Sequence, residues 1–231
     1  LMFSDSIEAM YPQDENNDYP FKLCKHIFTS YLKEFKSKKI KFLDIGCGRG
    51  VHTKNFMKHL NGEFYAVDLE KSEIENVNVS SCNLESQILP YDDDFFDVVF
   101  TKSVIEHISN TNNFISEIHR VLKVGGSLII LAPDWQSQMK NFYDDPTHVK
   151  PFTIKSMNSS LKMNGFDNVK VSYFRQLPIV WKFPFFEYAC DAISIIFPES
   201  FKWKNLTDRN TKDRKWVRFS KEKMLLGVCI K

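Results

Sequence analysis

The feature that most constrains the fold is the segment 42–50, FLDIGCGRG. Apolar residues surround Asp44 and lead directly into glycines at every second position, Gly46, Gly48 and Gly50. An apolar run of this kind is typical of a buried parallel strand. Glycine allows the backbone to adopt a positive φ and to lie against a ligand with no Cβ between them. The segment therefore predicts a strand, a tight turn built for close contact, and a helix over about 51–60.

The spacing of the glycines argues against two common classes of ligand-binding loop. A dinucleotide-binding G-x-G-x-x-G motif would need glycine where Val51 stands. A phosphate-binding P-loop is excluded because no Lys-Ser or Lys-Thr pair follows the glycines. The plain alternative is a strand-to-helix turn that binds nothing.

A second strand supports the ligand interpretation. Asn61-Gly62 predicts a turn, and the run 63–67 (EFYAV) predicts a short strand that ends on Asp68. A carboxylate at a strand tip can accept two hydrogen bonds from a ribose diol. Taken alone, Asp68 would be interpreted as a helix cap or turn residue, but together with the glycine turn it is interpreted as a ligand-binding residue.

The rest of the chain alternates strands and helices, which predicts an α/β fold with a doubly wound, mainly parallel sheet of seven strands. We expect a single domain over 1–231, divided into an arm and helix (1–40), a core (41–175), an insertion between strands 6 and 7 (176–223) and a last strand (224–231). The further strands are expected at 77–81, 95–100, 127–132, 168–174 and 224–230, and the further helices at 21–35, from about 114 to a stop at Gly125-Gly126, and from a cap at Thr153 to Gly165.

Composition is ordinary for a folded protein. The net charge of +2 over 231 residues gives no general argument for nucleic acid or membrane binding. No signal peptide is evident, and charges and prolines interrupt the apolar part of the insertion too often for a transmembrane helix. We expect a cytoplasmic protein with reduced thiols, because the five cysteines are scattered and include no C-x-x-C pair: Cys24, Cys47, Cys82, Cys190 and Cys229.

Five segments in order resemble the class I S-adenosylmethionine-dependent methyltransferases of type 11: FLDIGCGRG, AVDLE, CNLES, LPYDDDFFDVVFTKSVIEHI and EIHRVLKVGGSLIILAPD. The resemblance implies a Rossmann-like fold, S-adenosyl-L-methionine as cofactor and S-adenosyl-L-homocysteine as product. It places Asp44 and the three glycines beside the amino-acid part of the cofactor and Asp68 on the ribose. It places Leu69, Asn83 and Leu84 at the adenine, and Thr101 to Ser103 at the methionine portion. The family often has aspartate at position 83, although the asparagine carbonyl can also accept a hydrogen bond.

The catalytic candidates lie where parallel strands of such folds bind ligands. Adjacent residues on a helix point in different directions, so Glu106 and His107 form no catalytic pair by themselves. The resemblance nevertheless turns this Glu-His pair toward the cofactor pocket, which keeps His107 as a candidate beside the alternative of helix packing and capping. In the loop 143–148, His148 is a candidate general base positioned by Asp145, with Asp134 on the acceptor. The alternative is a cluster of hydrogen bonds that only organises the loop. No metal is expected, and a divalent-metal site in this loop is the weaker interpretation.

The expected activity is O-methylation of a sugar or small anionic metabolite, nucleotide-linked or destined for a surface polysaccharide. The aromatic part of the insertion and the excess of basic residues over 202–223 leave other acceptors open. These are a quinone or lipid-type C- or O-acceptor, an N-acceptor, and RNA, which no recognition motif supports. The non-enzyme alternative is an inactive cofactor-binding partner protein. Peripheral membrane contact through 176–203 and a homodimer are further possibilities.

Overall fold

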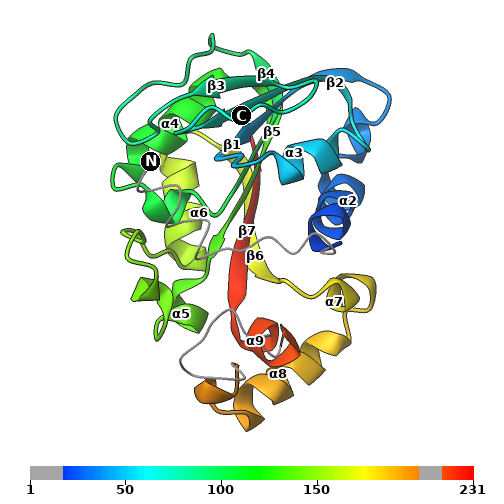
Figure 1. The fold of residues 1–231 in the computed structure, drawn as a ribbon, viewed down its shortest axis with the longest axis vertical. Helices are drawn as coiled ribbons and strands as arrows, with labels where there is room; N and C mark the ends of the chain where they lie inside the picture. Colours follow the sequence, from blue (N-terminus) through cyan, green and yellow to red (C-terminus); the bar gives the residue numbers. More distant parts are fainter. Residues whose placement is uncertain (1–17, 203–214) are drawn as a thin grey trace.

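The computed structural model describes residues 18–202 and 215–231, which form one seven-stranded sheet of order β3-β2-β1-β4-β5-β7-β6 (Figure 1). Neighbouring strands are parallel except at β7, which runs antiparallel to both β5 and β6. The predicted α/β architecture, with an insertion before the last strand, is confirmed. The strands are β1 (Lys39–Ile45), β2 (Asn61–Asp68), β3 (Asn78–Ser81), β4 (Phe96–Lys102), β5 (Leu122–Pro133), β6 (Asp167–Arg175) and β7 (Lys223–Ile230).

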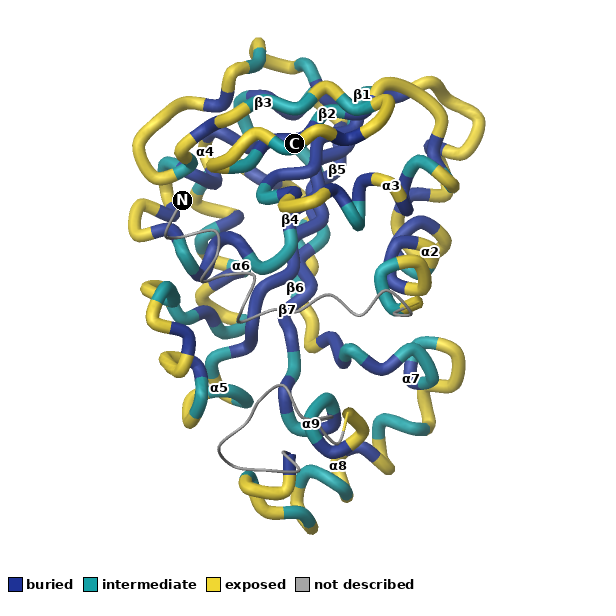
Figure 2. Tube along the Cα trace, in the orientation of Figure 1, coloured by how far each residue is buried: buried dark blue, intermediate teal, exposed yellow. Residues whose placement is uncertain are grey.

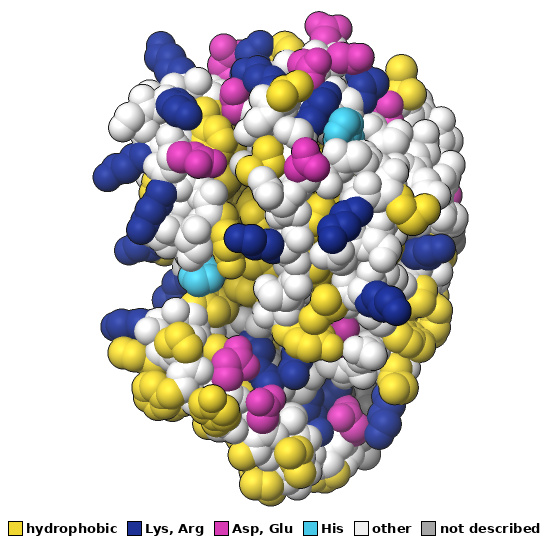
Figure 3. Space-filling view, turned by 180° about the vertical axis from the view of Figure 1, so that it is seen from behind, with side chains coloured by type: hydrophobic (Ala, Val, Ile, Leu, Met, Phe, Trp, Pro, Cys, Tyr) yellow, Lys and Arg dark blue, Asp and Glu magenta, His cyan; other side chains and the backbone are white. Residues whose placement is uncertain are grey.

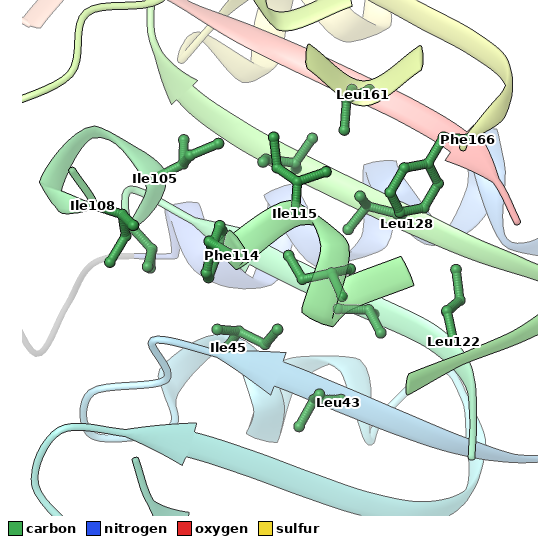
Figure 4. Packing of buried hydrophobic residues seen from close by; sticks show 14 of the residues in the cluster. Leu43, Ile45, Ile105, Ile108, Phe114, Ile115, Leu122, Leu128, Leu161 and Phe166 are labelled. Atoms are coloured by element: carbon green, nitrogen blue, oxygen red, sulfur yellow. The ribbon is translucent and has the colours of Figure 1, made fainter. Parts of the chain in front are cut away.

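Helices cover both faces of the sheet because its central strands are apolar on both sides. Phe42 and Phe100 pack with the helices of one face, and Leu43 and Val99 pack with those of the other (Figure 4 shows the second cluster). The first face is covered by α2 (Tyr19–Tyr31), η1 (Lys33–Phe35) and α3 (Val51–Phe56), and the second by α4 (Thr111–Val121) and α6 (Ile154–Met163).

Two local predictions are wrong, the turn at Asn61-Gly62 and the helix stop at Gly125-Gly126. Asn61 and Gly62 lie inside β2 and pair with β1. A Cβ on Gly62 would overlap the carbonyl oxygen of Ile40, so the glycine permits close strand approach and not a turn. Gly125 and Gly126 lie inside β5, where the Gly125 N–H donates to the carbonyl oxygen of the last residue, Lys231 (2.8 Å). The helix predicted from residue 51 is also shorter than expected and ends at Phe56.

The insertion forms a cap at one end of the molecule (Figure 1). Its α8 (Phe186–Ile196) exposes the apolar side chains of Tyr188, Ile195 and Ile196. Exposed segments (Figure 2) and hydrophobic side chains (Figure 3) are visible at this end of the molecule. Trp203 and most of the basic run 202–223 lie outside the described residues. The elements of the cap are α7 (Pro178–Lys182), α8 (Phe186–Ile196), η4 (Glu199–Lys202) and α9 (Lys215–Lys221).

Candidate active site

The glycine turn follows β1 at the carboxyl edge of the sheet. Gly46, Gly48 and Gly50 all have positive φ, of 73°, 52° and 73°. A Cβ on Gly46 would overlap Val104, and one on Gly50 would overlap Ile74, whereas nothing lies within 4 Å of a Cβ on Gly48. The outer two glycines therefore serve packing, and Gly48 presents bare backbone to open space.

Asp68, at the end of β2, ties this turn to the neighbouring strand. One carboxylate oxygen accepts the N–H of Gly48 (2.8 Å), and the other accepts the N–H of Leu69 (2.7 Å). Each oxygen of an ionised carboxylate has a second lone pair, so the group can hold the turn and still accept hydrogen bonds from a diol. Leu69 is more than half exposed beside it.

Asp44 lies under the turn, within the sheet. It is almost fully buried and accepts a hydrogen bond from the hydroxyl of Thr53 (2.5 Å) on α3. Burial raises the pKa of Asp44 to about 7, and the nearby charge of Asp68 contributes in the same direction. This carboxyl group therefore keeps its proton to a much higher pH than an exposed aspartate does.

The Asp44→Asn variant should remove a pH dependence of stability. Because the pKa of Asp44 is raised in the folded state, that state binds more protons than the unfolded chain between pH 4 and 7. As the pH rises from 4 to 7, this group should lower the free energy of unfolding of the wild type by roughly 2–4 kcal/mol. The variant should lack this decrease. Urea denaturation at several pH values measures the free energy of unfolding of both proteins. The same dependence on pH in both proteins would contradict the prediction.

The predicted adenine-edge residues follow β3, next to the end of β2. Asn83 begins a turn there, since its side-chain carbonyl accepts the N–H of Glu85 (3.0 Å) and its own N–H donates to Gln87 (2.7 Å). Leu84 packs partly buried against the core. The side-chain carbonyl of Asn83 is thus already used in the turn.

At the end of β4, Thr101 pairs in register with Ile45 of β1, so it lies beside the start of the glycine turn. It is buried, and its hydroxyl has no hydrogen-bond partner within the described part of the chain. Ser103 has a φ of 57°, and its N–H donates to Leu131 of β5 (2.9 Å). The chain thus turns sharply away from the sheet at this point.

That turn leads into a short 3₁₀ segment, η2 (Ile105–His107), which sequence reasoning treated as α-helical. One ligand atom each of Glu106, His107 and His148 lies within 4.8 Å of those of the other two. Glu106 and His107 come this close because the segment is not an α-helix, and His148 joins them because a distant loop closes on the segment. Ile105 and Ile108 anchor the segment in the core (Figure 4).

The electrostatics of this cluster are unusual. Glu106 is buried, which raises its pKa to about 8. Burial, followed by the neighbouring His148, lowers the pKa of His107 below its ordinary value. A buried acid with a raised pKa and a histidine with a lowered pKa are suited to acid–base chemistry or to ligation. Glu106 was not among the predicted site residues, because nothing in its local sequence signals burial.

The other two predicted catalytic residues have structural partners. Asp145 accepts the N–H (2.9 Å) and hydroxyl (2.5 Å) of Thr147, and its second oxygen lies 3.9 Å from Nε2 of His148. Asp134 is buried and caps α5 (Trp135–Gln138) by accepting the N–H of Ser137 (2.8 Å). Asp145 thus borders the histidine, whereas Asp134 organises the chain after β5.

A separate cavity of about 330 Å³ lies at the opposite, amino edge of the strands, lined by residues that include Lys39, Lys41, Asp97 and Lys123. It contains none of the candidate residues. Among the described helices, none has the length and hydrophobicity needed to cross a membrane.

Residues 43–130 match the model of a methyltransferase domain. An uncharacterised protein of Methanocaldococcus jannaschii is 31% identical over 156 residues, which cover 65% of this chain and 66% of that protein. A ubiquinone biosynthesis O-methyltransferase of Maricaulis maris is 29% identical over 117 residues, or 46% of this chain and 45% of that one. The chain spans less than two thirds of the length of either relative.

The fold is shared with solved structures. A S-adenosylmethionine-dependent methyltransferase from Archaeoglobus fulgidus superposes with a TM-score of 0.64 at 20% sequence identity, covering 99% of this chain and 100% of that one. The similarity thus extends over the cap as well as the sheet.

Proposed function

Residues 43–130 form a methyltransferase domain of the S-adenosylmethionine-dependent type 11 family, and we propose that the protein uses it to methylate a hydroxyl oxygen of a small acceptor. The observation that carries this proposal is the cluster of the buried Glu106 with the partly buried His107 and His148. It follows β4, whose end lies beside the glycine turn of β1. An acceptor placed there would meet both the cofactor and a group able to remove its proton.

The chemistry requires one new bond and one proton acceptor. The hydroxyl oxygen attacks the methyl carbon of the sulfonium, the C–S bond breaks, and the proton passes to a base. Nδ1 of His148 lies 2.6 Å from the carbonyl oxygen of Phe142, so it carries the hydrogen and leaves Nε2 with a lone pair. We therefore assign the proton-accepting role to Nε2 of His148, with Asp145 beside it.

A sugar or small anionic metabolite is the acceptor that we favour, because Glu106, His107 and His148 offer it three polar side chains. Neither relative named above is described as a polysaccharide enzyme, so a role in surface-glycan synthesis rests on this polarity alone. The homodimer and the cytoplasmic location likewise stay predictions.

A second candidate acceptor is a phenolic, quinone-type molecule. It is favoured by the name of the Maricaulis maris relative and by the apolar surface of the cap. Besides the exposed residues of α8, Phe185 is 63% exposed next to them. An apolar surface of this kind suits contact with a lipid-like acceptor.

Transfer of a labelled methyl group from S-adenosylmethionine into a cell extract tests these proposals. The extract is separated afterwards into small-molecule, glycan, lipid, protein and nucleic-acid fractions. Label in the small-molecule or glycan fraction supports the sugar-type acceptor, and label in the lipid fraction supports the quinone-type acceptor. Label confined to protein or nucleic acid, or no label at all, would contradict the proposal.

The His148→Ala variant should lose turnover by about 10²–10⁴-fold, the usual contribution of a positioned base. Its affinity for S-adenosylhomocysteine should stay unchanged, because the glycine turn and Asp68 are intact. Single-turnover kinetics and calorimetry measure the two quantities. His119→Ala is the matched control, since His119 packs edge-on against Phe166 and belongs to no such cluster. Turnover at the wild-type rate would reject His148 as the base.

A further inference from the structure

The two histidines of the cluster are oriented in the same way. Nδ1 of His107 lies 3.2 Å from the carbonyl oxygen of Thr147 and 2.9 Å from the hydroxyl of the same residue. Nδ1 of His148 lies 2.6 Å from the carbonyl oxygen of Phe142. A carbonyl only accepts, so each Nδ1 carries the hydrogen and each Nε2 keeps its lone pair. Metal-ligating histidines are typically fixed in this manner.

Glu106 supplies a third donor of a different kind. It is 1% exposed, and neither of its carboxylate oxygens has a hydrogen-bond partner in the parts of the chain that the structure describes. Buried carboxylates are normally hydrogen-bonded, paired with a charge or bound to a metal. The charge of Lys102 acts on Glu106 and favours its ionised form, but it satisfies neither oxygen by a hydrogen bond, so both oxygens stay available to a ligand.

The backbone holds these donors together. The N–H groups of Val149 and Lys150 both donate to the carbonyl oxygen of Glu106 (2.9 Å each). These bonds fix the loop that carries His148 against the segment that carries Glu106 and His107. The rings of the two histidines consequently lie with centroids 4.8 Å apart. The site is thus preorganised by main-chain contacts and not by the side chains alone.

We propose that Glu106, His107 and His148 bind a divalent transition-metal ion. Metal–ligand bonds of about 2.0–2.2 Å place the ligand atoms of one ion roughly 3–4 Å apart. The separations within 4.8 Å in this cluster therefore require side-chain shifts of about 1 Å or less. Two imidazoles and one carboxylate favour zinc, iron or manganese over magnesium or calcium, which prefer oxygen ligands alone.

Three protein ligands leave open positions on the metal. Resting on the proposed function, this site would bind the acceptor hydroxyl directly. An ion held by Glu106, His107 and His148 would make the acceptor hydroxyl more acidic, so that its proton would pass to solvent more readily as the oxygen attacks the methyl group and the C–S bond breaks. In the metal-loaded protein His148 holds the ion. It accepts the proton itself only when the metal is absent.

Titration of the chelator-treated chain of 231 residues with Co²⁺ tests the site. We expect one equivalent to bind, with visible d–d absorption and without the charge-transfer band of a cobalt–thiolate bond. The Glu106→Gln and His107→Gln variants should each weaken binding at least about tenfold. His119→Ala should bind as the wild type does. Absence of saturable binding, or binding that survives in both ligand variants, would overturn the proposal.

Affinity for S-adenosylhomocysteine and methyl transfer are measured on the same samples. A variant that keeps the wild-type affinity for S-adenosylhomocysteine is folded at this edge of the sheet. If one of the two ligand variants loses that affinity, the metal binding of the other variant decides whether the site exists. Metal binding without methyl transfer to any fraction would reject the proposed function and keep the metal site. Methyl transfer by a protein that binds no Co²⁺ would reject the metal site and keep the function.

Discussion

The Asp68→Ala variant will bind S-adenosylhomocysteine about 10- to 100-fold more weakly than the wild type. The carboxylate lies at the end of β2, beside the bare backbone of Gly48, and its second lone pairs are available to a ribose diol. A hydrogen bond to a charged group contributes about 1.5–3 kcal/mol, and each 1.4 kcal/mol changes affinity about tenfold. Loss of the Gly48 contact adds to this effect, because the turn is then less well held.

Asp97 provides a matched control for this experiment. Its carboxylate also bridges two strands, by accepting the N–H of Lys41 (2.7 Å) and pairing with Lys123 (2.7 Å). It does so at the amino edge of the sheet, away from the glycine turn. Asp97→Ala should therefore lower stability and leave cofactor affinity unchanged. If calorimetry found equal affinities for the Asp68→Ala protein and the wild type, the ribose would not be bound at the end of β2.

The sheet could be predicted because its central strands are apolar on both faces. FLDI and FFDVVF bury residues on both sides, and the glycines after the first of them mark the carboxyl edge. The extent of the strands could not be predicted in the same way. β5 begins at Leu122, before its two glycines, because Leu122 pairs with Phe96 and Gly125 pairs with the end of the chain. Such pairing partners are distant in sequence, and local propensity carries no information about them.

The same distinction holds for the candidate site. Residues at strand ends, such as Asp68 and Thr101, could be placed at one edge, since parallel strands align their carboxyl ends. The role of Glu106 could not be predicted, because it depends on main-chain bonds from Val149 and Lys150. Those bonds bring a loop more than 40 residues away against a 3₁₀ turn. These two hydrogen bonds hold the loop over Glu106 and so bring His148 to it.

Substitution of Arg175 should have the second large effect, which is a loss of stability. Its guanidinium, at the end of β6, is buried and bonds Glu187 through Nε (2.6 Å), Asp191 and the carbonyl oxygen of Ser220. These three partners belong to α8 and α9, so one side chain joins the sheet to the cap. Arg175→Ala should lower the free energy of unfolding by about 2–4 kcal/mol. Urea denaturation measures the loss, and limited proteolysis should cut within 176–223 before the core.

Variants of Glu187 and Asp191 show how much each partner of Arg175 contributes to this loss of stability. The side chains of Glu187 and Asp191 are 45% and 55% exposed, so either carboxylate can be hydrated when its partner is lost. In Glu187→Gln or Asp191→Asn the buried guanidinium keeps the other carboxylate and an amide oxygen that can still accept, so each variant should cost less than about 1 kcal/mol. Arg175→Lys should still cost more than either, because an ammonium group cannot reproduce the planar set of donors that reaches two helices at once. An Arg175→Lys protein as stable as the wild type would show that charge alone, and not this geometry, holds the cap to the sheet.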